Sequence, residues 1–320
     1  MFIRMSIKKD EIVFIINPVS GGGKTGKLWP EIEKKIRQKF VNITVLFTKK
    51  KAEAVSLSRK CVIAKVPIIV SVGGDGTISE VASGFIGANN KPIEKPSAKS
   101  TALGILPMGS GCDLIRTLQI PNNVDKALDI ILQGKRKIID MGMVTFKNYQ
   151  KKTEKRPFIN ISDVGIGAQV MHIFDKQDKK WGPFISYQSA TLRGVLQYKN
   201  KHFKIYLDNK LIKDQIMHSV IVANGKYFGS GMKVAREAEL DDGYFNAILI
   251  DKISTIKFLM LLPFLQRGIY AKIKEINMYK VKNIKIETNS NAFIELDGEQ
   301  LGTAPAEFQM INSAVSVFVP

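Results

Sequence analysis

The stretch Pro67–Thr77, PIIVSVGGDGT, joins a short apolar run to a turn that contains three glycines and Asp75. The run Pro67–Val72 predicts a buried strand of a parallel sheet, and the residues Ile78–Ile86 that follow are typical of a helix. Glycine lets backbone amides approach an anion closely, and the start of a helix favours negative charge. The stretch therefore predicts a strand, a loop and a helix arranged to hold phosphate.

The same alternation continues on both sides of this stretch. Further strands are expected at Glu11–Ile16, Ile43–Phe47 and Ala102–Leu106. Helices are expected at Trp29–Phe40, at Ala52–Lys60, from near Cys112, and at Val124–Gln133. Strands that alternate with helices predict a parallel sheet covered on both faces, so residues 1–140 are expected to form one α/β domain.

Two more glycine loops, Asn17–Gly23 and Gly109–Gly111, also follow expected strands. Because the carboxyl ends of parallel strands share one edge of the sheet, all three loops are expected to converge there, with a polyphosphate as the ligand. Each loop alone is equally typical of a tight turn without a ligand. Gly23-Lys24-Thr25 is similar to the end of a Walker A loop, but Pro18 stands where the leading glycine belongs, so Lys24 is not assigned that role.

Asp75 has two interpretations. An aspartate in a turn commonly caps the next helix. Beside a bound triphosphate, the same carboxylate would instead hold magnesium.

After Asp140 the sequence changes to short strand-like segments separated by turn signals such as Asp242-Gly243 and Asp297-Gly298. Residues 141–320 are therefore expected to form a mostly antiparallel β-sandwich domain. Ile253–Ala271 is the one helix expected there, and Lys147–Arg156 is expected to be a solvated hairpin loop.

Composition limits the function classes. The 320 residues include 48 Lys and Arg against 29 Asp and Glu, a net charge of +19 that favours anionic partners. We find no nucleic-acid motif, no histidine spacing for zinc, and no apolar stretch near the roughly 18 residues that span a bilayer. Two cysteines and no signal segment predict a reduced, cytoplasmic setting. The positive charge suits a position peripheral to the inner face of a membrane.

Several motifs together resemble the diacylglycerol kinase catalytic family, which includes sphingosine and ceramide kinases. They are Phe14–Gly21 (FIINPVSG), Gly73–Val81 (GGDGTISEV), Leu106–Asp113 (LPMGSGCD), Phe158–Asn160, Asp242-Gly243 and Asp297–Glu299. The resemblance covers nearly the whole chain. It implies a phosphofructokinase- or NAD-kinase-like α/β lobe, a β-sandwich lobe, and ATP with magnesium in the cleft between them.

Carried over position by position, the resemblance assigns roles to individual residues. Glu299 matches the catalytic acid/base position, and Asp75 is the second candidate catalytic carboxylate. Asp242, with the carbonyls of Glu239 and Tyr244, matches a second, structural magnesium site. The implied ATP contacts are Asn17, Pro18, Val19, Ser20, Gly21, Thr48, Gly73, Gly74, Asp75, Gly76, Thr77, Ile78, Ser79 and Ser110.

Three residues and one segment carry alternatives. Cys112 and Ser79 stand where the family usually has Asn, and a thiol is a weaker hydrogen-bonding group than an amide. Without the resemblance, Glu299 after a two-residue turn would be read as an exposed turn carboxylate. Phe258–Phe264 (FLMLLPF) is either a helix buried in the second domain or a surface that touches lipid.

These observations predict an ATP-dependent kinase of a lipid alcohol, most simply diacylglycerol, that binds an anionic membrane surface and no nucleic acid; a homodimer is left open. NAD kinase is the near alternative, although its third loop resembles GxNxGxLGFL rather than Gly-Ser-Gly-Cys-Asp. A non-catalytic lipid- or nucleotide-binding relative is the other alternative.

Overall fold

A computed structural model describes residues 11–109, 111–177, 183–270 and 273–320. The chain divides into two compact units, and each is described by itself. The first contains residues 1–139 with 313–320, and the second contains residues 140–312. The last eight residues thus belong to the first unit, whereas the predicted second domain ran to residue 320. The reason is the end of one long strand, β14 (Glu299–Phe318), which pairs with the first unit's sheet.

The first unit has the predicted parallel sheet. Its strands are β1 (Ile12–Ile16), β2 (Ile43–Phe47), β3 (Ile68–Gly73) and β4 (Ala102–Pro107), which pair in parallel in the order β2, β1, β3, β4. Ser316 and Val317 of β14 add a further parallel pairing on β4. Most of the strand residues are buried because helices cover both faces of the sheet, so the expected α/β fold is confirmed.

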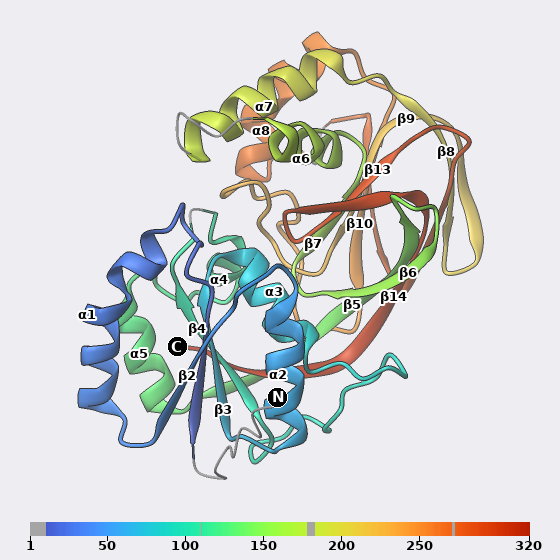
Figure 1. Ribbon diagram of the computed structural model, residues 1–320. Coiled ribbons are helices and arrows are strands. Elements are labelled where there is room, and N and C mark those ends of the chain that lie inside the picture. The colour runs from blue at the N-terminus through green and yellow to red at the C-terminus, as the bar shows by residue number, and fades with distance from the viewer. Residues whose placement is uncertain (1–10, 110, 178–182, 271–272) are drawn as a thin grey trace. The chain divides into compact units, whose positions relative to one another are not determined.

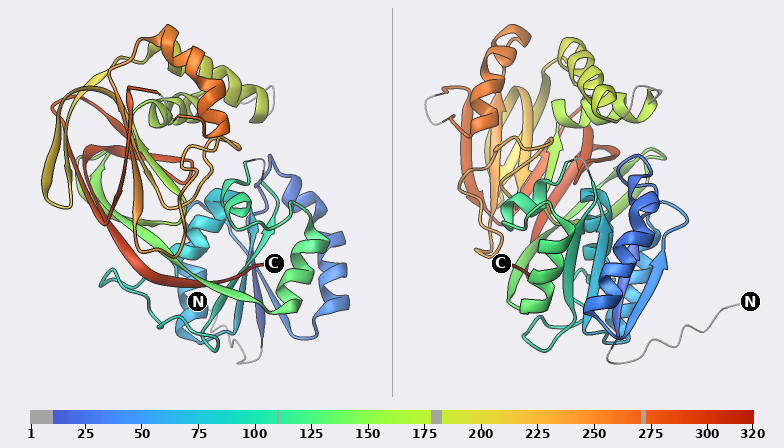
Figure 2. Two further views of the ribbon diagram at one scale, coloured as in Figure 1. Left: turned by 180° about the vertical axis from the view of Figure 1, so that it is seen from behind. Right: turned by 90° about the vertical axis from the view of Figure 1, so that its left-hand side faces the viewer.

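Five helices of the first unit join these strands (Figure 1). They are α1 (Lys24–Lys39), α2 (Glu53–Ile63), α3 (Asp75–Ser83), α4 (Asp113–Thr117) and α5 (Val124–Gln133). Helices α1 and α5 lie on one face of the sheet, and α2 and α3 lie on the other, which the two views of Figure 2 also show. Because the strands are parallel, the loops that follow their carboxyl ends all lie at the same end of the unit.

The second unit is mainly antiparallel, as expected. Besides β14, its strands are β5 (Arg136–Asn148), β6 (Thr153–Phe158), β7 (Ile161–Val164), β8 (Lys201–Leu207), β9 (Lys210–Ala223), β10 (Phe245–Asp251), β11 (Ile276–Val281), β12 (Asn283–Glu287) and β13 (Phe293–Leu296). The pairing β9–β7–β13–β14–β12–β8–β9 closes on itself, so the strands form a barrel-like ring. The hairpin predicted at Lys147–Arg156 is present, because Lys147 pairs with Thr153, but its loop is shorter than expected since β5 runs to Asn148 and β6 begins at Thr153.

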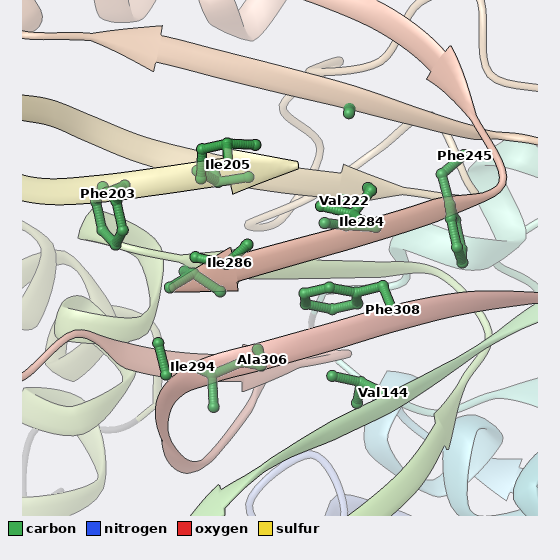
Figure 3. Close-up of a cluster of buried hydrophobic side chains, with 14 of the residues drawn as sticks. Val144, Phe203, Ile205, Val222, Phe245, Ile284, Ile286, Ile294, Ala306 and Phe308 are labelled. Atoms are coloured by element: carbon green, nitrogen blue, oxygen red, sulfur yellow. The ribbon is translucent and has the colours of Figure 1, made fainter. Parts of the chain in front are cut away.

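Apolar side chains from this ring fill the core of the second unit. Figure 3 shows Phe308 and Ala306 of β14 in one cluster with Val222 of β9 and Ile284 of β12. Phe158 stacks on Phe245 with ring centroids 5.7 Å apart. This closely packed interior gives the loops and turns at its rim a rigid support.

Three helices complete the second unit: α6 (Ile166–Lys176), α7 (Pro183–Gln197) and α8 (Thr255–Arg267). The expectation of a single helix here was wrong. Helix α6 begins after Gly165 without a side-chain cap, so the usual sequence signal for a helix start is missing. None of the helices in the described ranges combines the length and apolar character needed to cross a membrane.

Candidate active site

The three glycine loops of the first unit meet backbone to backbone. A Cβ atom added to Gly109 would lie 2.4 Å from the Cα of Gly74, and one added to Gly21 would lie 2.7 Å from the carbonyl oxygen of Met108. Any larger residue at Gly109 would force the second and third loops apart. The predicted convergence of the loops is thus a feature of the structure.

Hydrogen bonds fix the first loop to the second. The Asn17 amide donates from Nδ2 to Thr77 Oγ1 at 3.1 Å and accepts from the Val19 amide at 3.2 Å. Thr77 is buried in the first turn of α3, so Asn17 anchors its loop to the start of that helix. Val19 at the tip of the loop is 74% exposed.

Asp75 combines features of both interpretations. Its Oδ1 accepts from the backbone amides of Asp113 at 2.9 Å and Leu114 at 3.3 Å, so it caps α4, a helix distant in sequence, and not α3. Burial raises the pKa of this carboxyl, and the backbone hydrogen bonds oppose that rise. The carboxylate is therefore held in a fixed orientation between the second and third loops.

Cys112 adopts the backbone conformation that explains why asparagine suits this position. Its φ of 55° is left-handed, and asparagine tolerates that region better than most residues. The thiol donates to the carbonyl of Gly109 at 3.2 Å, and burial together with Asp75 raises its pKa to about 11. The protonated thiol thus closes the third loop in place of an amide.

The remaining predicted ATP contacts differ in whether their polar groups are already hydrogen-bonded or buried. Thr48 follows β2, and its amide donates to the carbonyl of Ile16. The side chain of Ile78 is buried and its amide donates to the carbonyl of Gly74, so neither group is directed at a ligand. Ser79 lies half-buried in α3, whereas Ser110 lies outside the described residues.

A cavity of about 480 Å³ lies beside the first and third loops, between the start of α1 and the start of α5. Gly21, Met108 and Gly109 line it together with Lys24 and Lys35. Lys24 was not predicted to bind phosphate because the Walker A pattern does not match. The structure nevertheless places this lysine, directly after the glycine run, on the cavity wall. The glycine amides and the Lys24 ammonium suit an anionic ligand, whereas Lys35 is ion-paired with Asp125 at 2.8 Å and Glu31 adds a carboxylate to the wall.

Glu299 lies in the second unit, where it opens β14 after a tight turn. Asp297 and Gly298 have φ values of 48° and 86°, as a type I′ hairpin turn requires, and Leu296 pairs with Glu299 across it. The predicted two-residue turn is confirmed. Glu299 is half-buried rather than fully exposed.

Asp297 holds this turn in place. Its carboxylate accepts from the backbone amides of Ile159, Asn160 and Ile161 at 2.9, 2.9 and 3.1 Å. Strand β6 ends at Phe158 and β7 begins at Ile161, because the amides of Ile159 and Asn160 between them bind this side chain. Three charge-assisted bonds to buried amides fix the position from which Glu299 projects.

The expected second magnesium site is already occupied by a side chain. Asp242 Oδ1 accepts from the Tyr244 amide at 3.0 Å, and Oδ2 accepts from the Lys280 ammonium at 2.8 Å. Since Lys280 supplies the counter-charge, Asp242, Glu239 and Tyr244 as arranged do not fit a magnesium ion unless Lys280 moves away. Within the described residues, no group of three or more His, Cys, Asp or Glu side chains could hold a metal.

Two family models match the chain over most of its length. The diacylglycerol kinase catalytic domain matches residues 11–144, which contain all three glycine loops. The YegS C-terminal NAD kinase beta sandwich-like domain matches residues 160–319, which contain Glu299.

Relatives from several bacteria resemble the whole chain. A protein of Staphylococcus saprophyticus named diacylglycerol kinase is 26% identical over 96% of this chain and 94% of its own length. One from Staphylococcus aureus with the same name is 27% identical over 96% and 91%.

Solved structures share the fold. A putative diacylglycerol kinase from Bacillus anthracis is similar with a TM-score of 0.74 and 23% identity, covering 98% of this chain and 99% of that one. Yeast NADH kinase complexed with NADH is similar with a TM-score of 0.57 and 11% identity, covering 98% and 84%. The chain belongs to the diacylglycerol kinase catalytic family, with a second domain of the YegS C-terminal type.

Proposed function

We propose that this protein is an ATP-dependent kinase that transfers the γ-phosphate to a lipid hydroxyl, with diacylglycerol as acceptor and phosphatidate as product. The observation that carries the proposal is the convergence of three glycine loops within the part of the chain that matches the catalytic domain model. The names of the relatives support diacylglycerol as the acceptor.

Each residue would contribute a separate part of the reaction. The glycine loops would bind the phosphates through backbone amides, with Lys24 as an added positive charge. Magnesium bound with ATP would neutralise phosphate charge, and Asp75 is the carboxylate of the loops that would hold it. Glu299, fixed by the turn at Asp297, would accept the proton of the lipid hydroxyl as it attacks.

We further propose that the protein works as a peripheral protein on an anionic membrane at the cytoplasmic face. The net charge of +19 supports attraction to such a surface. Helices α7 and α8, which contact each other, both expose large apolar side chains, and such side chains would suit contact with lipid. The exposed residues are Ile185, Leu192 and Leu196 on α7 and Ile256, Leu259, Met260 and Phe264 on α8.

The acceptor is tested directly by incubating the protein with ATP labelled in the γ-phosphate and separate acceptors. Diacylglycerol, monoacylglycerol, sphingosine, a polyprenol and NAD are each supplied, and labelled products are identified by mass. Labelled phosphatidate from diacylglycerol supports the proposal. Label in NADP would favour the NAD kinase alternative, and ATP binding without any labelled product would favour a non-catalytic role.

A further inference from the structure

Two carboxyl groups lie side by side in the interior of the second unit. Asp163 on β7 and Glu295 on β13 are direct register partners in an antiparallel pair, so their side chains are on the same face of the sheet. Asp163 is 1% exposed and Glu295 is 0% exposed. Neighbouring buried acids of this kind require a specific arrangement of protons or partners.

Each carboxyl group has one oxygen held by a backbone amide. Asp163 Oδ2 accepts from the amide of Ala168 at 3.0 Å, near the start of α6. Glu295 Oε2 accepts from the amide of Gly298 at 2.9 Å, in the turn that carries Glu299. The other two oxygens, Asp163 Oδ1 and Glu295 Oε1, are buried and have no hydrogen-bond partner in the described part of the chain.

The surrounding charges cannot neutralise two carboxylates. Asp297 adds a further acidic group near Glu295, and no ion pair from Lys, Arg or His to Asp163 or Glu295 is found among the described residues. Burial raises the pKa of Asp163 to about 7, and burial with repulsion from Asp163 raises that of Glu295 well above its usual value. One proton between the two groups would remove one charge, and it would give both unpartnered oxygens a hydrogen bond.

We propose that Asp163 and Glu295 share one proton and act as positioning residues that connect the start of α6 to the turn carrying Glu299. A second contact runs parallel to this one, because His172 on α6 hydrogen-bonds through Nδ1 with Gln300 Oε1 at 3.0 Å. Gln300 directly follows Glu299 and pairs with Glu295 across the hairpin. The catalytic part of this inference rests on the proposed kinase function, whereas the shared proton does not.

Infrared spectroscopy tests the shared proton without any assay of activity. In Glu295→Gln, the side-chain amide can accept a hydrogen bond from the Gly298 backbone amide and donate one to Asp163. The variant therefore keeps the geometry of the pair but removes the shared proton. At neutral pH the wild-type protein is expected to show the C=O stretch of a buried carboxylic acid, and this band is expected to vanish in Glu295→Gln. Glu307→Gln, at an exposed position of β14, is the matched control and should retain the band. A wild-type spectrum without the band would overturn the proposal.

The pH dependence of stability provides a second test. The unfolded chain loses both protons near the ordinary values of 3.8 and 4.5, whereas the folded pair retains its protons to higher pH. The stabilisation is therefore complete below about pH 4 and is lost as pH rises through about 7 and above. The wild-type melting temperature should fall more steeply between neutral and alkaline pH than that of Glu295→Gln. Equal slopes would count against a shared proton.

Kinetics test the positioning role. Glu295→Gln should keep turnover within about twofold, while Glu295→Ala, checked for folding by circular dichroism, should lose roughly tenfold or more in kcat with an unchanged KM for ATP. The decline of wild-type kcat at alkaline pH should be absent in Glu295→Gln. Full kcat in Glu295→Ala would overturn the positioning role. If the wild-type protein phosphorylates no lipid, the kinase proposal fails, and the infrared band still decides the shared proton.

Discussion

The carboxylate of Asp75 accepts a hydrogen bond from the backbone amide of Asp113 at 2.9 Å. An acidic side chain in the second glycine loop thereby caps the helix that follows the third loop, where Cys112 provides no side-chain cap. The two loops are consequently fixed to each other by the same residue that would face the phosphates and their metal. A structural role and a metal-binding role for Asp75 are compatible, and they can be separated by experiment.

Asp75→Asn separates the two roles because the Asn side-chain oxygen can still accept from both amides of α4 while the charge is removed. We expect this variant to fold with a nearly unchanged melting temperature but to lose about 100-fold or more in turnover with magnesium and ATP. Asp75→Ala should lose the cap as well and be destabilised by about 1 kcal/mol or more. Wild-type turnover in Asp75→Asn would show that Asp75 is only a cap.

Gly109→Ala should disrupt the nucleotide site. The added methyl group would lie 2.4 Å from the Cα of Gly74, so the second and third loops would have to separate. We expect calorimetry to show a loss of ATP affinity of roughly tenfold or more, because the amides no longer converge. Gly134→Asn is a suitable control, since nothing lies within 4 Å of its Cβ and Asn tolerates a φ of 74°. Equal ATP affinity in both variants would contradict the convergence of loops on phosphate.

The first unit was largely predictable because its signals are local. An apolar run such as Ile68–Gly73 followed by a glycine turn identifies strand, loop and helix within about ten residues. Helix α5 has an Asn123 cap whose side chain accepts from the Lys126 amide and a left-handed Gly134 at its end, and its predicted bounds, Val124–Gln133, match the structure. When sequence signals mark both ends of a helix, its first and last residues can be predicted.

Features that depend on long-range contacts could not be predicted. The return of β14 to pair with β4 joins residues more than 200 positions apart, and no local pattern encodes it. Helices α6 and α7 were missed within a sequence dominated by strands. The burial of Asp163 and Glu295 was also hidden, because charged residues in a strand usually indicate its solvent face.

Magnesium alone should have little effect on the stability of the wild-type protein. Lys280 already neutralises Asp242, so we expect the melting temperature without nucleotide to change by less than about 1 °C on adding magnesium or a chelator. Lys280→Met exposes the carboxylate, so magnesium should then raise the melting temperature. A magnesium-dependent rise in the wild-type protein that is absent in Asp242→Ala would instead mean that a metal displaces Lys280.

The segment Phe258–Phe264 divides between core and surface, which defines a test of membrane binding. Phe258 is 6% exposed and stacks on His218, whereas Met260 and Phe264 are 61% and 48% exposed. The double variant Met260→Ser and Phe264→Ser should keep its melting temperature but bind vesicles containing anionic lipid more weakly, at high salt as well as low. Phe258→Ser should lose roughly 3 kcal/mol or more of stability, because it opens a cavity in the core.

Flotation across a salt series measures that binding and its electrostatic part. Wild-type binding to anionic vesicles should fall as salt screens the positive surface, and binding to neutral vesicles should be weaker throughout. Equal flotation with anionic and neutral vesicles at every salt concentration would contradict recruitment by charge.

The most direct test of the kinase proposal compares the wild-type protein with Glu299→Gln on diacylglycerol in mixed micelles, with ATP affinity measured by calorimetry. Loss of the general base should reduce kcat by about 100-fold or more without changing ATP binding, because a proton acceptor acts only in the transition state. Glu299→Asp, which retains a carboxylate on a shorter side chain, should recover part of the rate. Formation of phosphatidate at the wild-type rate by Glu299→Gln would contradict the account.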